Sequence, residues 1–121
     1  MRLASLLLPA AILMSAPALA HEVKQGPNGG RIADAGEHHV ELVVKNDSVD
    51  VFLSDHKDKA VSTDGFKGLA ILAIDGKSQR IVLEPAQNRL SGKASGTVAG
   101  SPKGVVQITP PSGKTVQARF N

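Results

Sequence analysis

The chain has 121 residues, a formal net charge of +3 at pH 7, three phenylalanines, and no cysteine, tryptophan or tyrosine. This length allows one domain at most, and so small a charge with so few aromatic side chains argues against a nucleic-acid-binding surface. Because no disulfide can form, the domain must be stabilised by its aliphatic core.

The N-terminal segment, residues 1–20, has the pattern of a signal peptide. Met1-Arg2 is positively charged, Leu3 to Met14 is largely apolar, and Ala18-Leu19-Ala20 fits a signal-peptidase site. The apolar part is shorter than the roughly 20 residues that a transmembrane helix needs. We therefore expect cleavage after Ala20, a mature chain that begins at His21 with no membrane span, and release into a bacterial periplasm.

The remaining chain divides into a flexible segment, 21–30, and a β-domain, 31–121. Short alternating or apolar runs between turn residues predict strands and no amphipathic helix. These strands are 31–35, 37–45, 48–56, 68–75, 79–84, 105–109 and 115–120, with 89–94 as a weaker strand and 60–64 as a short extended piece. Seven to eight short strands predict an all-β fold, either a small antiparallel β-sandwich of the Ig-like kind or a partly open barrel.

The sequence also predicts the burial of one of these strands and the end of another. The run Gly68 to Asp75 is continuously apolar, which favours a central strand buried on both faces. Pro85 is expected to end the strand that precedes it, because proline cannot donate a hydrogen bond to a neighbouring strand.

The stretch 37–56 predicts a β-hairpin that organises the domain. Asn46-Asp47 separates two alternating runs and suits a two-residue turn, which places Lys45 opposite Ser48. One face of the hairpin is then purely aliphatic, with the pairs Val44/Val49, Leu42/Val51 and Val40/Leu53. The other face carries Lys45/Ser48, Val43/Asp50, Glu41/Phe52, His39/Ser54 and Glu37/His56.

This second face is a candidate metal site. His39 and His56 would be diagonal neighbours, with Cβ atoms roughly 7–8 Å apart, so both imidazoles could bind one cation. Glu37 or Glu41 could add a carboxylate oxygen, and His21 would offer an imidazole and a free amino group at the mature N-terminus. His38 points to the aliphatic face opposite Asp55, where pairing with that carboxylate is the stronger interpretation, so it ranks below the others as a ligand.

The residues available favour nitrogen and oxygen ligands. Both methionines, Met1 and Met14, lie in the predicted signal peptide, and cysteine is absent. This ligand set suits Zn²⁺ or Cu²⁺, with Ni²⁺ as a further candidate, and argues against Cu(I). The alternative is that the histidines and acids simply form the solvated face of an ordinary hairpin.

Gly26-Pro27-Asn28-Gly29-Gly30 and Gly36-Glu37-His38-His39-Val40-Glu41-Leu42-Val43 carry a resemblance. They resemble small exported bacterial proteins with a Gly-Pro-x-Gly-Gly turn followed by a His-x-Glu strand. They are also similar to the N-terminal heavy-metal-associated domain of periplasmic adaptor subunits in efflux systems. The resemblance implies a periplasmic, metal-associated β-domain that stands alone, because the chain has no segment for the long helical hairpins of the adaptors. Relatives often have histidine before the Gly-Pro, where this chain has Gln25.

The function expected from these features is binding and not catalysis. The serines lack a nucleophile motif, and the domain is too short to enclose a large pocket. We expect a periplasmic protein that binds Zn²⁺ or Cu²⁺ in metal buffering, resistance or hand-over to a membrane or periplasmic efflux component. The alternative is a β-sandwich interaction module without a metal role.

Overall fold

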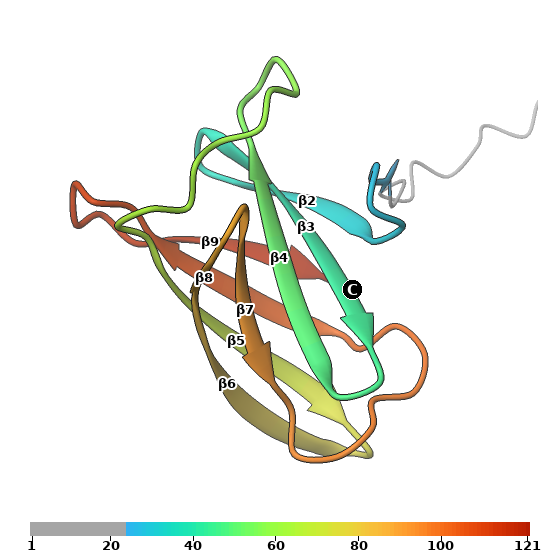
Figure 1. The fold of residues 1–121 in the computed structure, drawn as a ribbon. Helices are drawn as coiled ribbons and strands as arrows, with labels where there is room; N and C mark the ends of the chain where they lie inside the picture. Colours follow the sequence, from blue (N-terminus) through green and yellow to red (C-terminus); the bar gives the residue numbers. More distant parts are fainter. Residues whose placement is uncertain (1–23) are drawn as a thin grey trace, which may run out of the picture.

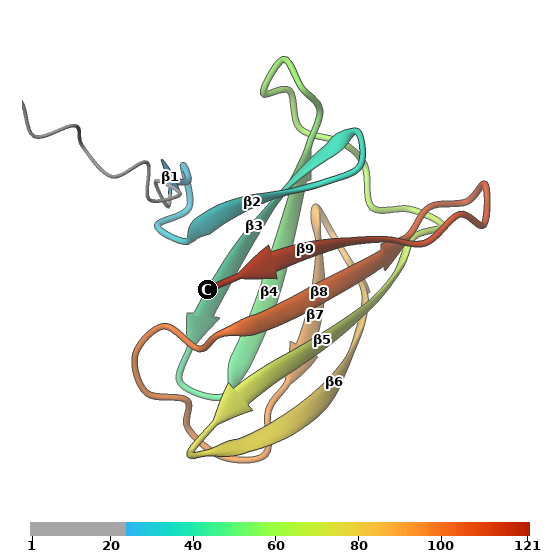
Figure 2. The same ribbon diagram turned by 180° about the vertical axis from the view of Figure 1, so that it is seen from behind.

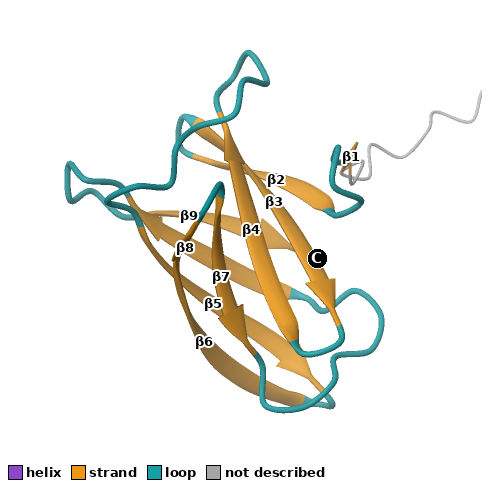
Figure 3. Ribbon diagram, viewed as in Figure 1, coloured by secondary structure: helices purple, strands orange, loops and turns teal. Residues whose placement is uncertain are grey.

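The computed structural model describes residues 24–121, so the predicted signal peptide and His21 lie outside the described residues. This part of the chain is all-β and contains no helix, hence none that could cross a membrane (Figure 3). Its strands are β1 (Lys24–Gln25), β2 (Arg31–Ala35), β3 (His38–Lys45), β4 (Ser48–Ser54), β5 (Lys67–Ile74), β6 (Lys77–Ala86), β7 (Arg89–Lys93), β8 (Gly104–Thr109) and β9 (Val116–Phe120).

The strands form one antiparallel sheet in the order β1-β2-β3-β4-β7-β6-β5-β8-β9. Strand β6 joins its two halves, because residues 77–83 pair with β5 and residues 84–86 pair with β7. The sheet curls until β9 comes alongside β2 without pairing with it (Figure 1). The expected small antiparallel all-β fold is confirmed. Residues 24–121 form nine strands, where seven or eight were predicted, and the sheet has the form of a partly open barrel.

The core fills the inside of the curled sheet, and strand alternation explains its membership. In β3 and β4 the inward side chains are the aliphatic face predicted for the hairpin, and in β5 they are Ala70, Leu72 and Ile74. The buried hydrophobic residues are Ala35, Val40, Leu42, Val49, Val51, Leu53, Phe66, Ala70, Leu72, Ile74, Ile81, Leu83, Leu90, Ala94, Val98, Val106, Ile108, Ala118 and Phe120. Phe66 and Phe120 are therefore packing residues, as expected for aromatic side chains in a small core.

Arg31 bridges the seam where β2 approaches β9. Its guanidinium carbon lies 5.4 Å from the centre of the Phe120 ring, a cation–π contact. The same group donates hydrogen bonds to the carbonyls of Pro102 and Asn121. Partial burial lowers the pKa of Arg31, but arginine stays protonated at any ordinary pH. A single side chain thus supplies polar contacts across a seam that lacks strand pairing.

Three details differ from the sequence-based prediction. Strand β6 continues through Pro85 to Ala86, because only β7 pairs with this stretch and proline is tolerated where one side of a strand is free. Residues 60–64 form no strand, and only Ala60 bridges to Ser54. The predicted flexible segment 21–30 includes the short strand β1, which pairs with Arg31 and Ile32.

Strand β5 also departs from expectation. Its apolar run is not buried on both faces, because the sheet is covered only on its inner side. Leu69 and Ile71 point outward and are half-buried, and Ala73 is exposed. An aliphatic face of a central strand is left uncovered on the outside of the molecule.

Candidate metal centre

The hairpin forms in the predicted register and places His39 and Glu41 on the outer face of the sheet. The paired residues include Lys45–Ser48, Leu42–Val51, Glu41–Phe52 and His39–Ser54. Asn46 takes a φ of 56°, which the favoured two-residue hairpin turns require at their first central position. Strong alternation together with this turn explains why the register could be read from the residues.

The strand pairing ends at His39–Ser54, so the predicted pair Glu37/His56 does not form. Glu37 lies in the two-residue turn between Ala35 and His38, which are themselves paired. His56 lies in the loop 55–59, where the amide of Asp55 donates to the carbonyl of Lys59 and reverses the chain. Both side chains are exposed, and His56 is not the diagonal strand neighbour of His39 that we expected.

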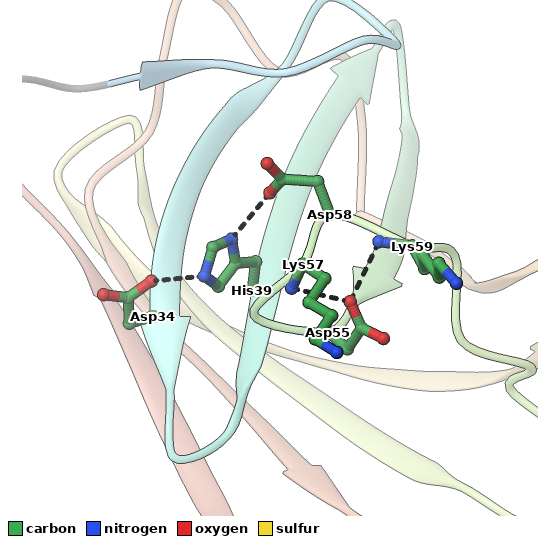
Figure 4. A network of polar contacts seen from close by, with 6 residues as sticks. All are labelled: Asp34, His39, Asp55, Lys57, Asp58 and Lys59. Atoms are coloured by element: carbon green, nitrogen blue, oxygen red, sulfur yellow. Dashed lines mark hydrogen bonds and ion pairs between the residues drawn. The ribbon is translucent and has the colours of Figure 1, made fainter.

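The carboxylate of Asp55 holds this loop. Its Oδ1 accepts hydrogen bonds from the amides of Lys59 at 2.9 Å and Lys57 at 2.8 Å. These bonds, the one from Lys59 above all, favour the ionised form and lower the pKa of Asp55. The loop carries Asp58 toward the outer face of β3 (Figure 4).

His39 lies between two carboxylates that come from different segments. Its Nε2 is 3.6 Å from Oδ1 of Asp34 on β2, and its Nδ1 is 3.4 Å from Oδ1 of Asp58 (Figure 4). The imidazole is partly exposed, at 27 %, and both aspartates are largely solvated. Sequence reasoning missed these partners. Asp34 could have been found by extending the strand pairing across the turn at Gly36-Glu37, since Asp34 is directly opposite His39.

The carboxylate of Glu41 is hydrogen-bonded to the turn that precedes β2. Glu41 is only 4 % exposed, and its carboxylate accepts three hydrogen bonds of 2.9 Å, from the backbone and side chain of Asn28 and from the amide of Gly30. A β-carbon on Gly26 would lie 2.3 Å from Cδ of Glu41, so that position has room only for glycine. The carboxylate oxygens of Glu41 are therefore engaged by the Gly-Pro-Asn-Gly-Gly turn. This contact links the turn motif to the His-x-Glu strand motif.

His38 points to the inner side of the sheet, as predicted, but its partner is aromatic. Its ring meets that of Phe66 edge-on, with centroids 5.6 Å apart and an interplanar angle of 89°. The expected pairing with Asp55 is not among the ion pairs of the described residues. This half-buried histidine therefore packs at the margin of the core.

A groove runs beside His39 on the outer face of the hairpin. Its volume is about 770 Å³, within the range typical of small-molecule sites. Ile32, Phe52 and Val61 give it an apolar floor, and Lys24 and Gln25 line it where β1 begins. His39 and Asp58 also line it, so the candidate ligands face an accessible space.

Within residues 24–121, each ring nitrogen of His39 lies near one carboxylate oxygen, Nε2 near Asp34 and Nδ1 near Asp58. No three His, Asp or Glu side chains of this part of the chain come together as a ready ligand set. One imidazole nitrogen and one carboxylate are what the described structure offers a cation at a single point.

No model of a protein family matches the chain, and no curated protein or solved structure matches it.

Proposed function

We propose that the protein is an exported metal-binding domain that takes Zn²⁺ or Cu²⁺ at His39. The observation that supports this most directly is the partly exposed imidazole with a carboxylate at each nitrogen, beside an open groove. Imidazole and carboxylate together suit divalent ions of borderline hardness. Export to a periplasm and hand-over to an efflux component belong to the same proposal, on the grounds of the signal-peptide pattern and the resemblance described above.

The distances at His39 are compatible with a shared ion. Zinc binds nitrogen at about 2.0–2.1 Å and carboxylate oxygen at about 2.0–2.2 Å, so two ligands at a tetrahedral angle lie about 3.3–3.5 Å apart. The 3.4 Å between Nδ1 and Asp58 falls in this range. By contrast, a direct charge-assisted hydrogen bond would be near 2.7–2.9 Å.

The two carboxylates take different roles in this proposal. A neutral imidazole offers one nitrogen as a ligand and keeps a hydrogen on the other. Asp58 and Nδ1 would hold the ion. Asp34, whose Oδ1 is 3.6 Å from Nε2 and so beyond direct hydrogen-bonding distance, would move closer on metal binding to accept the hydrogen on Nε2 and fix the ring. A carboxylate behind a ligating histidine is a common arrangement around protein-bound metals.

Further ligands must complete the coordination sphere. His56 is two residues before Asp58 in the same exposed loop, and Lys24, which lines the groove, is three residues after His21. Three residues of extended chain reach about 10 Å. We include both histidines in the ligand set and leave out Glu41, whose oxygens are already engaged, and His38, which faces inward.

Isothermal titration of the mature protein with Zn²⁺ and with Cu²⁺ tests the proposal. We expect one ion per chain, with His39→Ala and Asp58→Asn each weakening binding at least tenfold and Asp34→Asn weakening it about 10–100-fold. Glu84→Gln, which removes an exposed charge on a distant strand, should bind as the wild type does. Unchanged affinity in His39→Ala would overturn the proposal.

Separate variants define the rest of the ligand set. His21→Ala and His56→Ala should each reduce affinity, and a loss of binding in either one, with unchanged thermal stability, identifies a ligand outside the strands. If neither changes affinity, water molecules fill the remaining positions and the site is formed by His39 and Asp58.

A further inference from the structure

The outer face of β5 and its neighbours is an uncovered surface unrelated to His39. Leu69 and Ile71 on β5, Val82 on β6 and Val105 on β8 all point away from the core, and Val82 is 65 % exposed. Figure 2 looks onto these strands. Strands with apolar residues on both sides are typical of sheets covered on both faces. We call this surface, together with the bordering cations Lys67, Arg80, Lys103 and Arg119, the basic–apolar face.

Cations border the aliphatic side chains in a regular row. Strand pairing aligns Arg80, Ile71, Val105 and Arg119 across β6, β5, β8 and β9. Lys67 at the start of β5 and Lys103 before β8 add two more exposed cations at its margins. Among the described residues of β5, β6, β8 and β9, Glu84 is the one acid; it is exposed and lies one residue beyond the last pair between β5 and β6. The face is therefore apolar in its centre and positive on both sides.

A shallow hollow lies within this face. It has a volume of about 360 Å³ and is lined by Ile71, Ala73, Val105, Lys103 and Arg119 among others. An apolar side chain of a partner could enter the hollow while an acidic side chain beside it on the partner reaches Lys103 or Arg119. Hollow and charge together favour a partner that is apolar and acidic at once.

From this arrangement we infer that the basic–apolar face docks an acidic amphipathic helix of a partner protein, with the apolar stripe of the helix along β5. Neighbouring strands are about 4.8 Å apart, so the backbones of Arg80 and Arg119 are separated by about 14 Å. A helix with its side chains is about 10–12 Å across. Carboxylates on both flanks of its apolar stripe would therefore meet Arg80 on one side and Arg119 on the other.

Two other occupants suit the face less well. A second copy of this chain packed through the same surface would bring like cations together, which is unfavourable. A lipid surface is typically met by tryptophan and tyrosine, and the chain contains neither. Both become outcomes of the experiment below.

Nuclear magnetic resonance titration of the mature protein tests the inference. The probe is a synthetic helical peptide with a leucine stripe flanked on both sides by glutamates. We expect amide shifts confined to β5, β6, β8 and β9, and at least tenfold weaker binding by the double variant Ile71→Ser and Val82→Ser. Absence of binding to the wild type, or shifts centred on the groove beside His39, would refute the inference.

Charge reversal gives the sharper result. The double variant Arg80→Glu and Arg119→Glu should lose the glutamate-flanked peptide at least tenfold and gain a lysine-flanked peptide of the same leucine pattern. The matched control is Lys45→Glu with Lys114→Glu, two exposed lysines elsewhere that alter net charge equally, and it should change affinity less than threefold. Equal loss in both variants would assign the effect to net charge and contradict a specific face.

The remaining occupants are examined with the same protein. Phosphatidylglycerol vesicles that bind more tightly than the peptide, through the same residues, would replace the helix with a membrane. Dimer formation in sedimentation, abolished by Val82→Ser, would replace it with a second copy. Each of these results overturns the inference as stated.

Discussion

The carboxylate of Glu41 accepts hydrogen bonds from both the amide and the side chain of Asn28, each at 2.9 Å. A third bond, from the amide of Gly30, engages the same group, which is almost completely buried. One acidic side chain from the middle of β3 thus holds the turn that precedes β2. The Gly-Pro-Asn-Gly-Gly segment and the His-x-Glu strand are two parts of one structural unit.

Loss of this carboxylate should destabilise the fold. Glu41→Ala leaves the buried amide of Gly30 without a partner, and we expect the free energy of unfolding to fall by about 3 kcal/mol. Glu41→Gln keeps an acceptor oxygen and should cost less than half of that. Urea unfolding measures both, with Glu84→Ala as the exposed control, expected within about 0.5 kcal/mol of wild type. A cost for Glu41→Ala as small as the control would contradict the role assigned to the carboxylate.

Gly26→Ala should be destabilising for a reason that depends on Glu41. The added methyl would meet three atoms of that side chain, the nearest at 2.3 Å, and displace it, at a cost of about 1–3 kcal/mol. In a Glu41→Ala background the clash disappears, so the two costs should not add. A double-mutant cycle in urea measures the coupling. Additive costs would show that the glycine is required for backbone reasons instead.

The sequence was sufficient for the hairpin because its signals agree. Val40, Leu42 and Val44 share one face, and Asn46-Asp47 permits one tight turn, so a slip by one residue would expose the aliphatic face. The barrel-like closure of the sheet had no such local signal. It depends on the contact of β2 with β9, elements far apart in the chain, and on the side chain of Arg31.

The site was harder to predict than the fold. His39 was identified, but Asp58 reaches it only because Asp55 binds the amides of Lys57 and Lys59 and reverses the loop just after β4. A strand extended to His56, as alternation suggested, omits this reversal. The register correctly placed Glu41 on the outer face opposite Phe52, but Glu41 is buried there, because three donors from the adjacent turn satisfy its carboxylate.

Acid should release the loop that carries Asp58. The pKa of Asp55 is lowered from 3.8 by the hydrogen bonds from Lys59 and Lys57, so the stabilisation is present above that unfolded value and is lost as pH falls through the lower folded value. Asp55→Asn should therefore be less stable than wild type at neutral pH, and the difference should shrink below about pH 4. Thermal unfolding across this pH range measures it. A difference that persists unchanged into acid would rule out the carboxylate as its origin.

Arg31 should control the seam between β2 and β9. Arg31→Ala removes the contact with Phe120 and the hydrogen bonds to the carbonyls of Pro102 and Asn121, so we expect a loss of about 1–2 kcal/mol. Arg31→Lys keeps the charge without the planar fork and should lose about half of this. Hydrogen exchange distinguishes seam opening from global destabilisation: amides of β2 and β9 should exchange faster in Arg31→Ala, while those of β5 and β6 change only with global stability. Uniform acceleration in all strands would show that Arg31 stabilises the domain as a whole without acting on the seam.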